Sequence, residues 1–592
     1  MTGPDVSSVA ALLREFAQRS ALRGDNPFRT KAYARAADNL LTLTVPLDQV
    51  IAEERLQNIP GVGKAIADIV KKLHATGSHP SLEKMRKEIP TNVLEMLTVP
   101  GLRPDKVLKL YRELGLRSLA ELEEAVRGDR PKIKGLGASL QSKILQGIEM
   151  RRAAQGRRHM HRAAALLKVA EKHLREAHPD IVRISPAGDF RRGCELVGDL
   201  SLAAEVRHRP DSAQALSTGV ELTARLTDAA HFGVTLLLAT GSEAHLAGLR
   251  AIAASRSMSL DDDGLRRDGK LVAASSEDSI YRALGMQPVP PELREGRNEI
   301  AQALAGNLPE LVTDHDIAGI LHAHTDRSDG LDTLETMAEA ALSRGYEYFG
   351  VSDHSRSAHY AGGLSQQEIA EQQAEADSLN RRSGERFRIF KGVESDILAD
   401  GSLDYPNEVL ETFDFVVASV HGRFNMDRAS QTERIIRAVS NPYTTILGHM
   451  TGRQLLRRPG YEIDTEKVLA ACAEHGVAVE INANPWRLDL DWRWHDIALK
   501  LGCFMSINPD AHSTRELDLT HWGVEMARKG GVPKERVLNC LSRDELALYL
   551  EKRRDRRVKL VSLQDGKPRL RTPTSGVKKS AAPRKRLQTT NH

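Results

Sequence analysis

Histidines and carboxylates end a series of short apolar runs in the C-terminal half of the chain. The runs include GILHAH, YFGVSDH, RIFKGVE, FVVASVH, TILGH, VAVEIN and FMSINPDAH. Imidazole and carboxylate groups together suit Mn²⁺, Zn²⁺ or Fe²⁺ better than Mg²⁺ or Ca²⁺. Cations held by such ligands can activate water and neutralise charge that develops on a phosphate. The pattern therefore predicts a metal-dependent hydrolase with more than one ion.

Short strands must position these ligands, because each apolar run stops at a ligand and alternates with helical stretches. In a βα barrel the catalytic groups lie at the C-terminal ends of the parallel strands. We therefore expect a barrel in the C-terminal half of the chain.

Three glycine-containing turns lie in the N-terminal 150 residues, which otherwise show the amphipathic periodicity of helices. The segments are IPGVGKAIADIV at 59–70, VPGLRPDKVLKLY at 99–111 and IKGLGASLQSKIL at 133–145. In each, an apolar residue precedes a turn that opens a helix, whose free N–H groups could hold a phosphate. A plain tight turn is the alternative for any single copy.

The three turns resemble the helix-hairpin-helix motif, which binds DNA backbone without reading its sequence. The predicted DNA contacts are Gly61, Gly63, Gly101, Gly135 and Gly137. The second copy is weaker, because Arg103 replaces its second glycine and a Cβ there hinders close approach of a phosphate.

Composition indicates an ordinary soluble protein with several domains. The 592 residues exceed what one core accommodates, and the net charge of +4 permits a nucleic-acid partner without requiring one. No apolar stretch approaches the roughly 20 residues of a membrane helix, and the first residues lack the features of a signal peptide. We expect a cytoplasmic monomer without membrane contacts. The four cysteines are widely separated and are assigned no role.

The middle of the chain resembles the palm and thumb of bacterial family X DNA polymerases. Those proteins carry a polymerase and histidinol phosphatase (PHP) domain behind the polymerase core. The similar segments are SPAGDFRRGCELVGDLSLAAEV at 185–206, FGVTLLLATGSEAHLAGLR at 232–250 and ALGMQPVPPELREGRNEI at 283–300. The resemblance implies a multidomain fold: an all-α helix-hairpin-helix N-terminal domain, an α+β palm and thumb, and a C-terminal PHP domain built as a distorted (β/α)7 barrel.

The resemblance also implies where the domains begin and end. They are an N-terminal helical domain with the first hairpin at 1–80, a fingers-like helical domain with two further hairpins at 81–150, a palm-like nucleotidyltransferase domain at 151–245, a thumb-like domain at 246–300, a linker at 301–317, the PHP domain at 318–558 and a basic tail at 559–592. The tail is rich in Pro, Ser and Thr and is expected to be disordered. It is either a solvated end or a tether that adds salt-sensitive affinity for DNA.

The PHP resemblance implies nine metal ligands, and a competent ligand fills each position. Two to three divalent ions are implied, Mn²⁺ or Zn²⁺ with Fe²⁺ as an alternative. The first ion would be held by His322, His324, Glu394 and Asp510. Glu394 would bridge to a second ion that His421 and His449 also hold. The third ion would be held by Asp329, His354 and His512.

Other residues near these ligands could take part in the chemistry. Asp353 could orient a ligand or accept a proton, or it could cap a helix. Glu480 and Asn482 share a strand face and could support the site. The candidate phosphate contacts are Arg453, Arg457, Arg458 and Arg487, each of which could instead be an ordinary solvated arginine. Asp353 and Arg453 are the candidate catalytic residues.

The palm-like segment departs from the family where its chemistry resides. Nucleotidyl transfer with two metals requires two carboxylates two residues apart on one strand face, and a third on a neighbouring strand. The chain keeps Asp199 but has Ser201 and Thr223 at the other two positions. Asp189 replaces a serine that lies near the nucleotide's phosphates in the family, and Ile69 replaces the Schiff-base lysine of eukaryotic relatives. We therefore predict a degenerate polymerase site in which Asp199 is a residual ligand that binds Mg²⁺ weakly or not at all.

Three functions from different classes remain open. The favoured one is a metal-dependent phosphoesterase acting on DNA, a 3′–5′ exonuclease or 3′-end processing enzyme whose hairpins hold gapped DNA or DNA 3′ ends. The second is a bifunctional gap-filling polymerase with a PHP 3′–5′ exonuclease. The third is a DNA-binding scaffold without catalysis. A small-molecule phosphatase would share the metal chemistry but would leave the hairpins unexplained.

Overall fold

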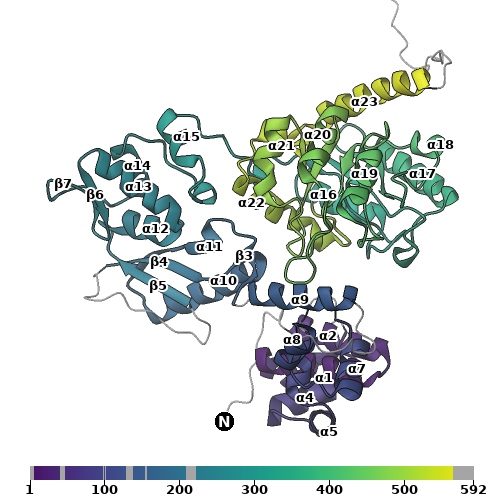
Figure 1. Cartoon of the computed structure of the whole chain (residues 1–592), viewed down its shortest axis with the longest axis horizontal. Coiled ribbons are helices and arrows are strands. Elements are labelled where there is room, and N and C mark those ends of the chain that lie inside the picture. Colours follow the sequence, from purple (N-terminus) through teal and green to yellow (C-terminus); the bar gives the residue numbers. More distant parts are fainter. Residues whose placement is uncertain are drawn as a thin grey trace, which may run out of the picture.

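The computed structural model describes residues 6–40, 47–59, 61–97, 99, 102–127, 138–153, 156–207 and 222–564. Figure 1 shows a helical N-terminal part, a mixed α/β part built around β4 and β5, and a larger C-terminal part in which strands are surrounded by helices. Among the described residues, no helix has the length and apolar character needed to cross a membrane.

The N-terminal part consists of short helices that bury two separate apolar cores. The first core joins α1 (Val6–Arg23), α2 (Pro27–Leu40), α3 (Leu47–Ala52), α4 (Lys64–Thr76) and α5 (Pro80–Glu88). The second joins α6 (Thr91–Met96), α7 (Pro104–Leu114), α8 (Leu119–Arg127) and α9 (Ala138–Ala153). Helix α9 lies between this helical part and the C-terminal part (Figure 1).

A three-stranded sheet forms the centre of the palm-like part. Its order is β2 (Ile181–Pro186), β4 (Leu200–Val206) and β5 (Leu222–Thr227), with β2 antiparallel and β5 parallel to β4. Helices α10 (Met160–Ala177), α11 (Gly188–Arg191) and α12 (Phe232–Thr240) contact β4, whose residues are all buried. A two-residue strand, β1 (Arg158–His159), pairs with β3 (Leu196–Val197).

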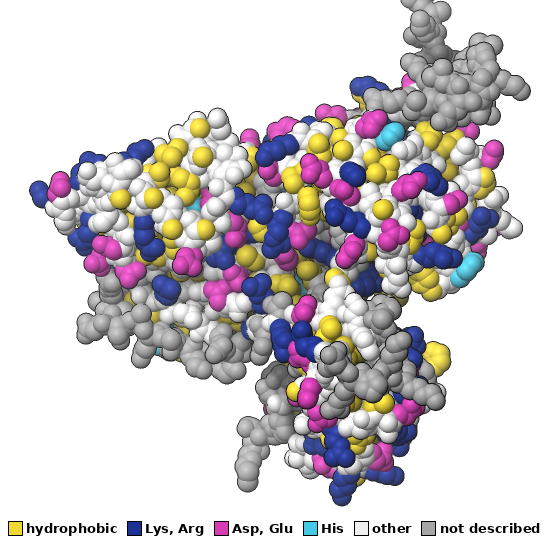
Figure 2. Space-filling model, in the orientation of Figure 1, with side chains coloured by type: hydrophobic (Ala, Val, Ile, Leu, Met, Phe, Trp, Pro, Cys, Tyr) yellow, Lys and Arg dark blue, Asp and Glu magenta, His cyan; other side chains and the backbone are white. Residues whose placement is uncertain are grey.

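The thumb-like part has its own small core. Helices α13 (Glu243–Ser255), α14 (Glu277–Ala283) and α15 (Glu299–Ala305) accompany the antiparallel strands β6 (Met258–Asp261), β7 (Gly264–Arg267) and β8 (Lys270–Ala273). His245 is fully buried there, where its two ring nitrogens contact Glu299 and Tyr281 at 2.8 and 2.9 Å. Ion pairs also join this part to the C-terminal barrel, and Figure 2 shows Lys and Arg side chains beside Asp and Glu side chains at that junction.

The C-terminal part is a parallel barrel of seven strands. In chain order they are β9 (Gly319–Ile320), β10 (Tyr348–Val351), β11 (Arg388–Asp396), β12 (Phe415–Ser419), β13 (Ile446–Leu447), β14 (Ala478–Asn482) and β15 (Met505–Asn508), and each pairs with its sequence neighbour. A parallel bridge between Ala323 and Ala511, just beyond β9 and β15, nearly closes the ring. The predicted distorted (β/α)7 barrel is therefore confirmed.

Helices alternate with the barrel strands and cover them. They are α16 (Leu334–Ser343), α17 (Gln366–Ser383), α18 (Asn407–Leu410), α19 (Arg428–Val439), α20 (Thr465–His475), α21 (His495–Leu501) and α22 (Thr520–Lys529). The last helix, α23 (Arg543–Gln564), extends six residues into the segment 559–592 that composition predicted to be disordered. The helix formers of VKLVSLQ explain this extension, and residues 565–592 lie outside the described part of the chain.

Candidate metal centre

Six strand ends or following loops deliver the nine sequence-predicted ligands to one end of the barrel. His322, His324 and Asp329 follow β9, His354 follows β10, Glu394 lies within β11, His421 follows β12, His449 follows β13, and Asp510 and His512 follow β15. Because all the strands run in the same direction, their C-terminal ends meet, as βα barrels require. The structure thus brings together side chains that are up to 190 residues apart in the sequence.

Glu394 lies at the centre of the cluster and its two oxygens face different histidines. Its Oε1 is 3.3, 3.2 and 3.0 Å from the Nε2 atoms of His322, His421 and His449. Its Oε2 is 2.9 Å from His354 Nδ1. A carboxylate with this placement can bridge two ions, which is the role that the sequence suggested for it.

Two further groups of ligand atoms lie on either side of His324. Its Nε2 is 3.2 Å from Asp510 Oδ1, and His322 Nε2 is 3.6 Å from the same oxygen. Its Nδ1 is 4.0 Å from Asp329 Oδ1, which also lies 3.2 Å from His512 Nε2. The sequence assigned His324 to the first ion alone, whereas the geometry groups it with both Asp510 and Asp329.

The donor atoms of this cluster fit divalent cations. Six buried atoms have no hydrogen-bond partner in the described structure: His322 Nε2, His324 Nδ1, His354 Nδ1, His449 Nδ1 and both oxygens of Glu394. Leaving a buried polar atom unpaired costs about 1–3 kcal/mol. Five of the six, all except His449 Nδ1, belong to or adjoin the groups of converging ligand atoms, where a bound cation would satisfy them.

The charges within the cluster are set by the pairing of imidazoles with carboxylates. Burial acts to raise the pKa of Glu394, but His421, His322 and His354 hold it well below its ordinary value. Burial similarly opposes the ionised form of Asp510, while His322, His324 and His512 keep its pKa well below the usual range. Both carboxylates therefore stay ionised at neutral pH, as ligands of a cation must.

Glu480 supports the cluster from β14. Its Oε1 accepts hydrogen bonds from His322 Nδ1 at 2.6 Å and Asn508 Nδ2 at 3.2 Å. Its Oε2 accepts from the His449 backbone N–H at 2.7 Å and from Asn482 Nδ2 at 3.3 Å. A proton held on His322 Nδ1 leaves Nε2 free to bind a cation, so Glu480 sets the tautomer of a ligand.

Asp396 performs the same task for His421, and sequence reasoning missed it. Its Oδ1 lies 2.6 Å from His421 Nδ1. The available signal was its position two residues after Glu394, which places both carboxylates on one face of β11. Tyr360 was also missed; its side chain is 72% exposed, and its ring centroid lies 6.3 Å from that of His354 and 6.5 Å from that of His421.

Asp353 fixes the loop that carries Asp329. It accepts hydrogen bonds from the Thr325 backbone N–H at 2.7 Å, from Thr325 Oγ1 at 2.6 Å, from Gln372 Nε2 at 2.5 Å and from Ser328 Oγ. It does not precede a helix, since the next α-helix begins at Gln366. These contacts agree with an orienting role and not with a helix cap.

Of the four candidate arginines, Arg487 contacts the cluster. Its Nε lies 3.6 Å from Asp510 Oδ2, and its side chain is 20% exposed. Arg453 instead donates to Asp491 Oδ2 at 2.6 Å and to the carbonyls of Arg487 and Leu488, so it holds the loop that carries Arg487. Arg457 and Arg458 line a cavity that the loop at 423–426 also lines.

The first hairpin leaves the N-terminus of α4 accessible. Gly61 has φ of 80°, the left-handed region that favours glycine. Val62 is buried and its N–H donates to Ile59 O at 3.0 Å, so the turn is anchored in the core. Gly63 caps α4 with an ordinary φ of −78°, and a Cβ at Gly63 would meet no atom within 4 Å. Glycine at position 63 therefore leaves the helix N-terminus open to approach from outside.

The described residues of the second hairpin repeat one hydrogen bond of the first without the same openness. The Leu102 N–H donates to Val99 O at 3.1 Å, and Arg103 caps α7 with φ of −79°. The Arg103 side chain projects to solvent, and Pro104 removes one N–H of the helix N-terminus. Both features reduce access to the N–H groups of α7, and the weaker DNA contact of this hairpin stays a prediction. The remaining predicted contacts, Gly101, Gly135 and Gly137, lie outside the described residues.

The structure also describes the residues that replace the family's lyase lysine and polymerase carboxylates. Ile69 is buried in the first core. The register of β4 and β5 pairs Ser201 with Thr223, so two hydroxyls stand where two carboxylates would be required. Asp199 Oδ1 accepts from the Asp189 N–H at 3.1 Å, and burial followed by the charge of Asp189 raises the pKa of Asp199.

Two other carboxylates of the palm could in principle replace the missing metal ligands. Both are already paired with other side chains. Glu205 Oε2 accepts from Arg183 Nε at 2.6 Å, and Asp228 Oδ1 contacts His231 Nδ1 at 2.7 Å. Asp189 itself accepts from the Gly198 N–H at 2.9 Å and pairs with Arg192. The carboxylate of Asp189 is therefore bound by groups of its own segment of the palm.

Three family models match separate parts of the chain. A helix-hairpin-helix domain matches residues 5–79, the DNA polymerase beta thumb matches residues 235–295, and the PHP domain matches residues 321–484. Together with the seven-stranded barrel, these matches confirm the predicted fold class.

Named relatives cover either the whole chain or its C-terminal part. A DNA polymerase/3′-5′ exonuclease PolX of Bacillus subtilis is 34% identical over 572 residues, which cover 92% of this chain and 99% of the relative. A probable phosphatase of Caldanaerobacter subterraneus subsp. tengcongensis is 28% identical over 252 residues, covering 40% of this chain and 91% of the relative. A probable phosphatase of Vibrio campbellii is 30% identical over 246 residues, covering 39% and 92%.

Proposed function

The chain belongs to the family X DNA polymerases that carry a C-terminal PHP domain, and we propose that it acts on DNA as a metal-dependent phosphoesterase. The proposed reaction is 3′–5′ exonucleolysis or 3′-end processing. The family and its PHP domain support an enzyme of the hydrolytic or nucleotidyl-transfer class, and its helix-hairpin-helix and polymerase domains imply DNA binding.

The difference between the ligand sets of the barrel and of the palm supports the choice of the barrel as the active site. Five of the nine predicted ligands are histidines whose ring nitrogens lie 2.9–3.7 Å from a carboxylate oxygen of Glu394 or Asp510, and Asp329 and His512 join them through His324 and His354. In the palm, by contrast, Ser201 and Thr223 pair across β4 and β5 where the family has carboxylates. Hydroxyl groups cannot replace charged ligands of a hard cation, so we assign hydrolysis to the barrel.

Divalent cations in the barrel, Mn²⁺ or Zn²⁺ with Fe²⁺ as an alternative, would activate water and neutralise charge on the reacting phosphate. They would be held by the nine predicted ligands. Glu480 and Asp396 hold protons on the Nδ1 atoms of His322 and His421, which keeps both Nε2 atoms as ligands. Arg487, beside Asp510, is placed to contact a phosphate oxygen.

The helical part would supply the DNA. The open N-terminus of α4 after Gly63 offers backbone N–H groups to a phosphate, and such contacts do not depend on base sequence. Asp353 and Arg453 are proposed as positioning residues, because they hold the loops that carry Asp329 and Arg487.

A second candidate function is a gap-filling polymerase with its own 3′–5′ exonuclease. It is favoured by the Bacillus subtilis relative, whose name includes both activities. It is opposed by Ser201 and Thr223, and by the internal contacts of Asp199.

The test uses the full-length protein, Mn²⁺ and a gapped duplex whose primer strand is labelled at its 5′ end, with and without deoxynucleotides. We expect stepwise shortening of the primer that Glu394→Gln abolishes and Asp199→Asn leaves unchanged. A melting temperature for each variant shows that the fold is kept. Extension of the primer would establish the polymerase instead, and no reaction on any DNA end would establish a non-catalytic scaffold.

A further inference from the structure

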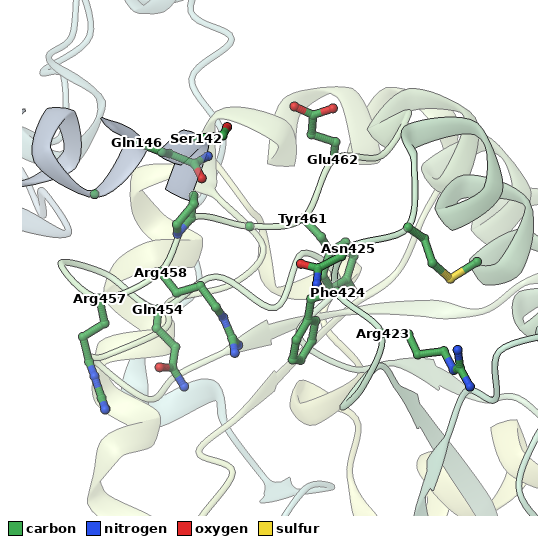
Figure 3. A pocket seen from close by; sticks show the side chains of 14 residues that line it. Ser142, Gln146, Arg423, Phe424, Asn425, Gln454, Arg457, Arg458, Tyr461 and Glu462 are labelled. Carbon is green, nitrogen blue, oxygen red and sulfur yellow. The ribbon is translucent and has the colours of Figure 1, made fainter. Parts of the chain in front are cut away.

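A cavity of about 850 Å³ lies between α9 and two loops of the barrel. One loop, 423–426, follows His421, and the other, 454–462, follows His449. Figure 3 shows Ser142 and Gln146 on the α9 side and the arginines on the loop side. We call this cavity the α9 groove.

The α9 groove has an excess of positive charge. Arg423, Arg457 and Arg458 line it, and Glu462 is the one carboxylate among its described lining residues. Arg423 and Arg457 are exposed, and their guanidinium groups form no ion pair within the part of the chain that the structure describes. Two uncompensated arginines on the wall of one cavity favour an anionic ligand.

Hydrogen bonds to backbone carbonyl groups hold the two loops that carry these arginines in place. Arg434 is buried and donates to Gly422 O at 3.0 Å and to Leu398 O at 2.8 Å. Arg423 has φ of 56°, which is strained for a residue other than glycine and persists only where surrounding contacts enforce it. The second loop is fixed by Arg458, whose Nη2 donates to Gly452 O at 2.6 Å.

The α9 groove adjoins the metal centre. Arg423 follows the predicted ligand His421 by two residues, so their Cα atoms are at most about 7 Å apart. Arg458 contacts Gly452, which follows the predicted ligand His449 by three residues. The two loops that line the groove therefore both begin beside predicted ligands.

The shape and side chains of the groove indicate which anion it takes. Its volume is near the upper end of the roughly 300–1,000 Å³ typical of small-molecule pockets, which is large enough to admit a short single strand. The ring of Phe424 is stacked with Tyr461 at 5.9 Å and lies under Arg458 at 4.3 Å. The loop aromatics are thus engaged with protein groups, which leaves the arginine guanidinium groups to contact backbone phosphates.

We propose that the α9 groove binds single-stranded DNA next to the phosphate that is cleaved, with Arg423 and Arg457 each contacting a backbone phosphate. This inference rests on the proposed function and adds where the strand lies. It predicts that binding depends on charge and strand length, and not on base sequence.

The test compares the full-length protein with the double variant Arg423→Gln and Arg457→Gln. The matched control is Arg381→Gln with Arg386→Gln, which removes two exposed arginines near the end of α17 and the start of β11, at the opposite end of the barrel. Binding of a fluorescein-labelled, hydrolysis-resistant oligodeoxythymidylate is measured by anisotropy at several salt concentrations.

Each phosphate contact on a single strand contributes about 0.7 to the slope of log K against log salt, so the groove variant should lose about 1.4 of slope and about 25-fold in affinity at 0.1 M salt. The control variant should bind as the wild type does. The proposal would be overturned if both variants lost the same oligonucleotide affinity. It would also be overturned if the groove variant bound the oligonucleotide as tightly as the wild type does.

A second substrate separates this proposal from the proposed function. The p-nitrophenyl ester of thymidine 5′-monophosphate is a phosphodiester too small to occupy the groove, and the groove variant should hydrolyse it with Mn²⁺ at the wild-type rate. If the wild type hydrolyses neither this ester nor DNA, the proposed function is wrong. If the wild type hydrolyses both and the groove variant degrades the oligonucleotide with an unchanged KM, the groove proposal alone is wrong. Displacement of the oligonucleotide by dTMP at equal concentration would identify the groove as a mononucleotide site instead.

Discussion

Glu480→Gln is expected to raise the Mn²⁺ concentration needed for half-maximal DNA hydrolysis by about 10- to 100-fold. Glu480 is fully buried and accepts hydrogen bonds through both oxygens. Glutamine has nearly the same shape but only one acceptor oxygen. The variant therefore tests the hydrogen bonds of this carboxylate with little change in packing.

Either orientation of the new amide disturbs a ligand. If its NH₂ group faces the His449 N–H, two donors meet, and the buried N–H loses the partner that now lies at 2.7 Å. If the NH₂ group faces His322 Nδ1, that nitrogen must become an acceptor and the proton moves to Nε2, the atom that faces Glu394 and Asp510. An unpaired buried group costs about 1–3 kcal/mol. Since 1.4 kcal/mol is tenfold, this range covers about 5- to 150-fold in cation affinity.

Glu299→Gln is the matched control. Glu299 is also a buried carboxylate, bound to His245 Nδ1 at 2.8 Å and to the Gly296 and Arg297 N–H groups at 2.7 Å, but it lies in the thumb-like part. Both variants should lower the melting temperature, and only Glu480→Gln should change the Mn²⁺ titration. Titrations that are unchanged in Glu480→Gln, or shifted equally in both variants, would refute a role for Glu480 in holding the tautomer of His322.

Three further outcomes follow from other parts of the molecule. No primer extension is expected in Mg²⁺ or Mn²⁺ with all four deoxynucleotides, because Asp199 keeps neither of its partner carboxylates; extension above background in a primer assay would contradict this. Gly63→Ala should weaken duplex DNA binding several-fold in an anisotropy assay while changing the unfolding free energy by less than about 1 kcal/mol, because Gly63 has an ordinary φ of −78°. His495 is neutral and fully buried, and burial lowers its pKa to about 4. Between pH 6.5 and 4 the unfolded chain binds more protons, so this group should remove about 2 kcal/mol of stability at pH 5; denaturant unfolding at pH 7 and 5 should show a smaller loss in His495→Gln.

The pattern of apolar runs indicated where eight of the nine barrel ligands lie, whereas the family resemblance supplied Asp329 and the choice of all nine. An apolar run that stops at histidine or carboxylate needs no knowledge of distant residues, and parallel strands necessarily bring such ends together. The contacts of His324 with both Asp510 and Asp329 could not be predicted in this way, because they depend on side-chain torsions in a packed interior. The sequence assigned each histidine to a single ion, whereas in the structure His324 lies between two groups of ligand atoms.

The choice among the arginines depended on backbone contacts that the sequence does not display. Arg453 and Arg487 both follow strands that end at the site, and their sequence neighbourhoods give no reason to prefer one. In the structure Arg453 is bound by Asp491 and two carbonyl groups, which leaves Arg487 beside Asp510. The partners of Asp353 likewise come from positions 325, 328 and 372, which only the fold brings together.

The palm-like part retains a physical role even though it lacks two of the three carboxylates of a polymerase site. Glu195 accepts from Trp492 Nε1 at 2.7 Å and from Arg493 at 2.9 Å, which ties β1–β3 of the palm to the loop that follows β14. Glu295 pairs with Arg192 of the palm at 3.0 Å and with Lys529 of the barrel, whose side chain is fully buried. Because the loop after β14 also carries Arg487, removing the palm would free one side of that loop and uncover buried charges. The barrel site of this chain is thus built against the palm, and its chemistry is best studied in the intact protein.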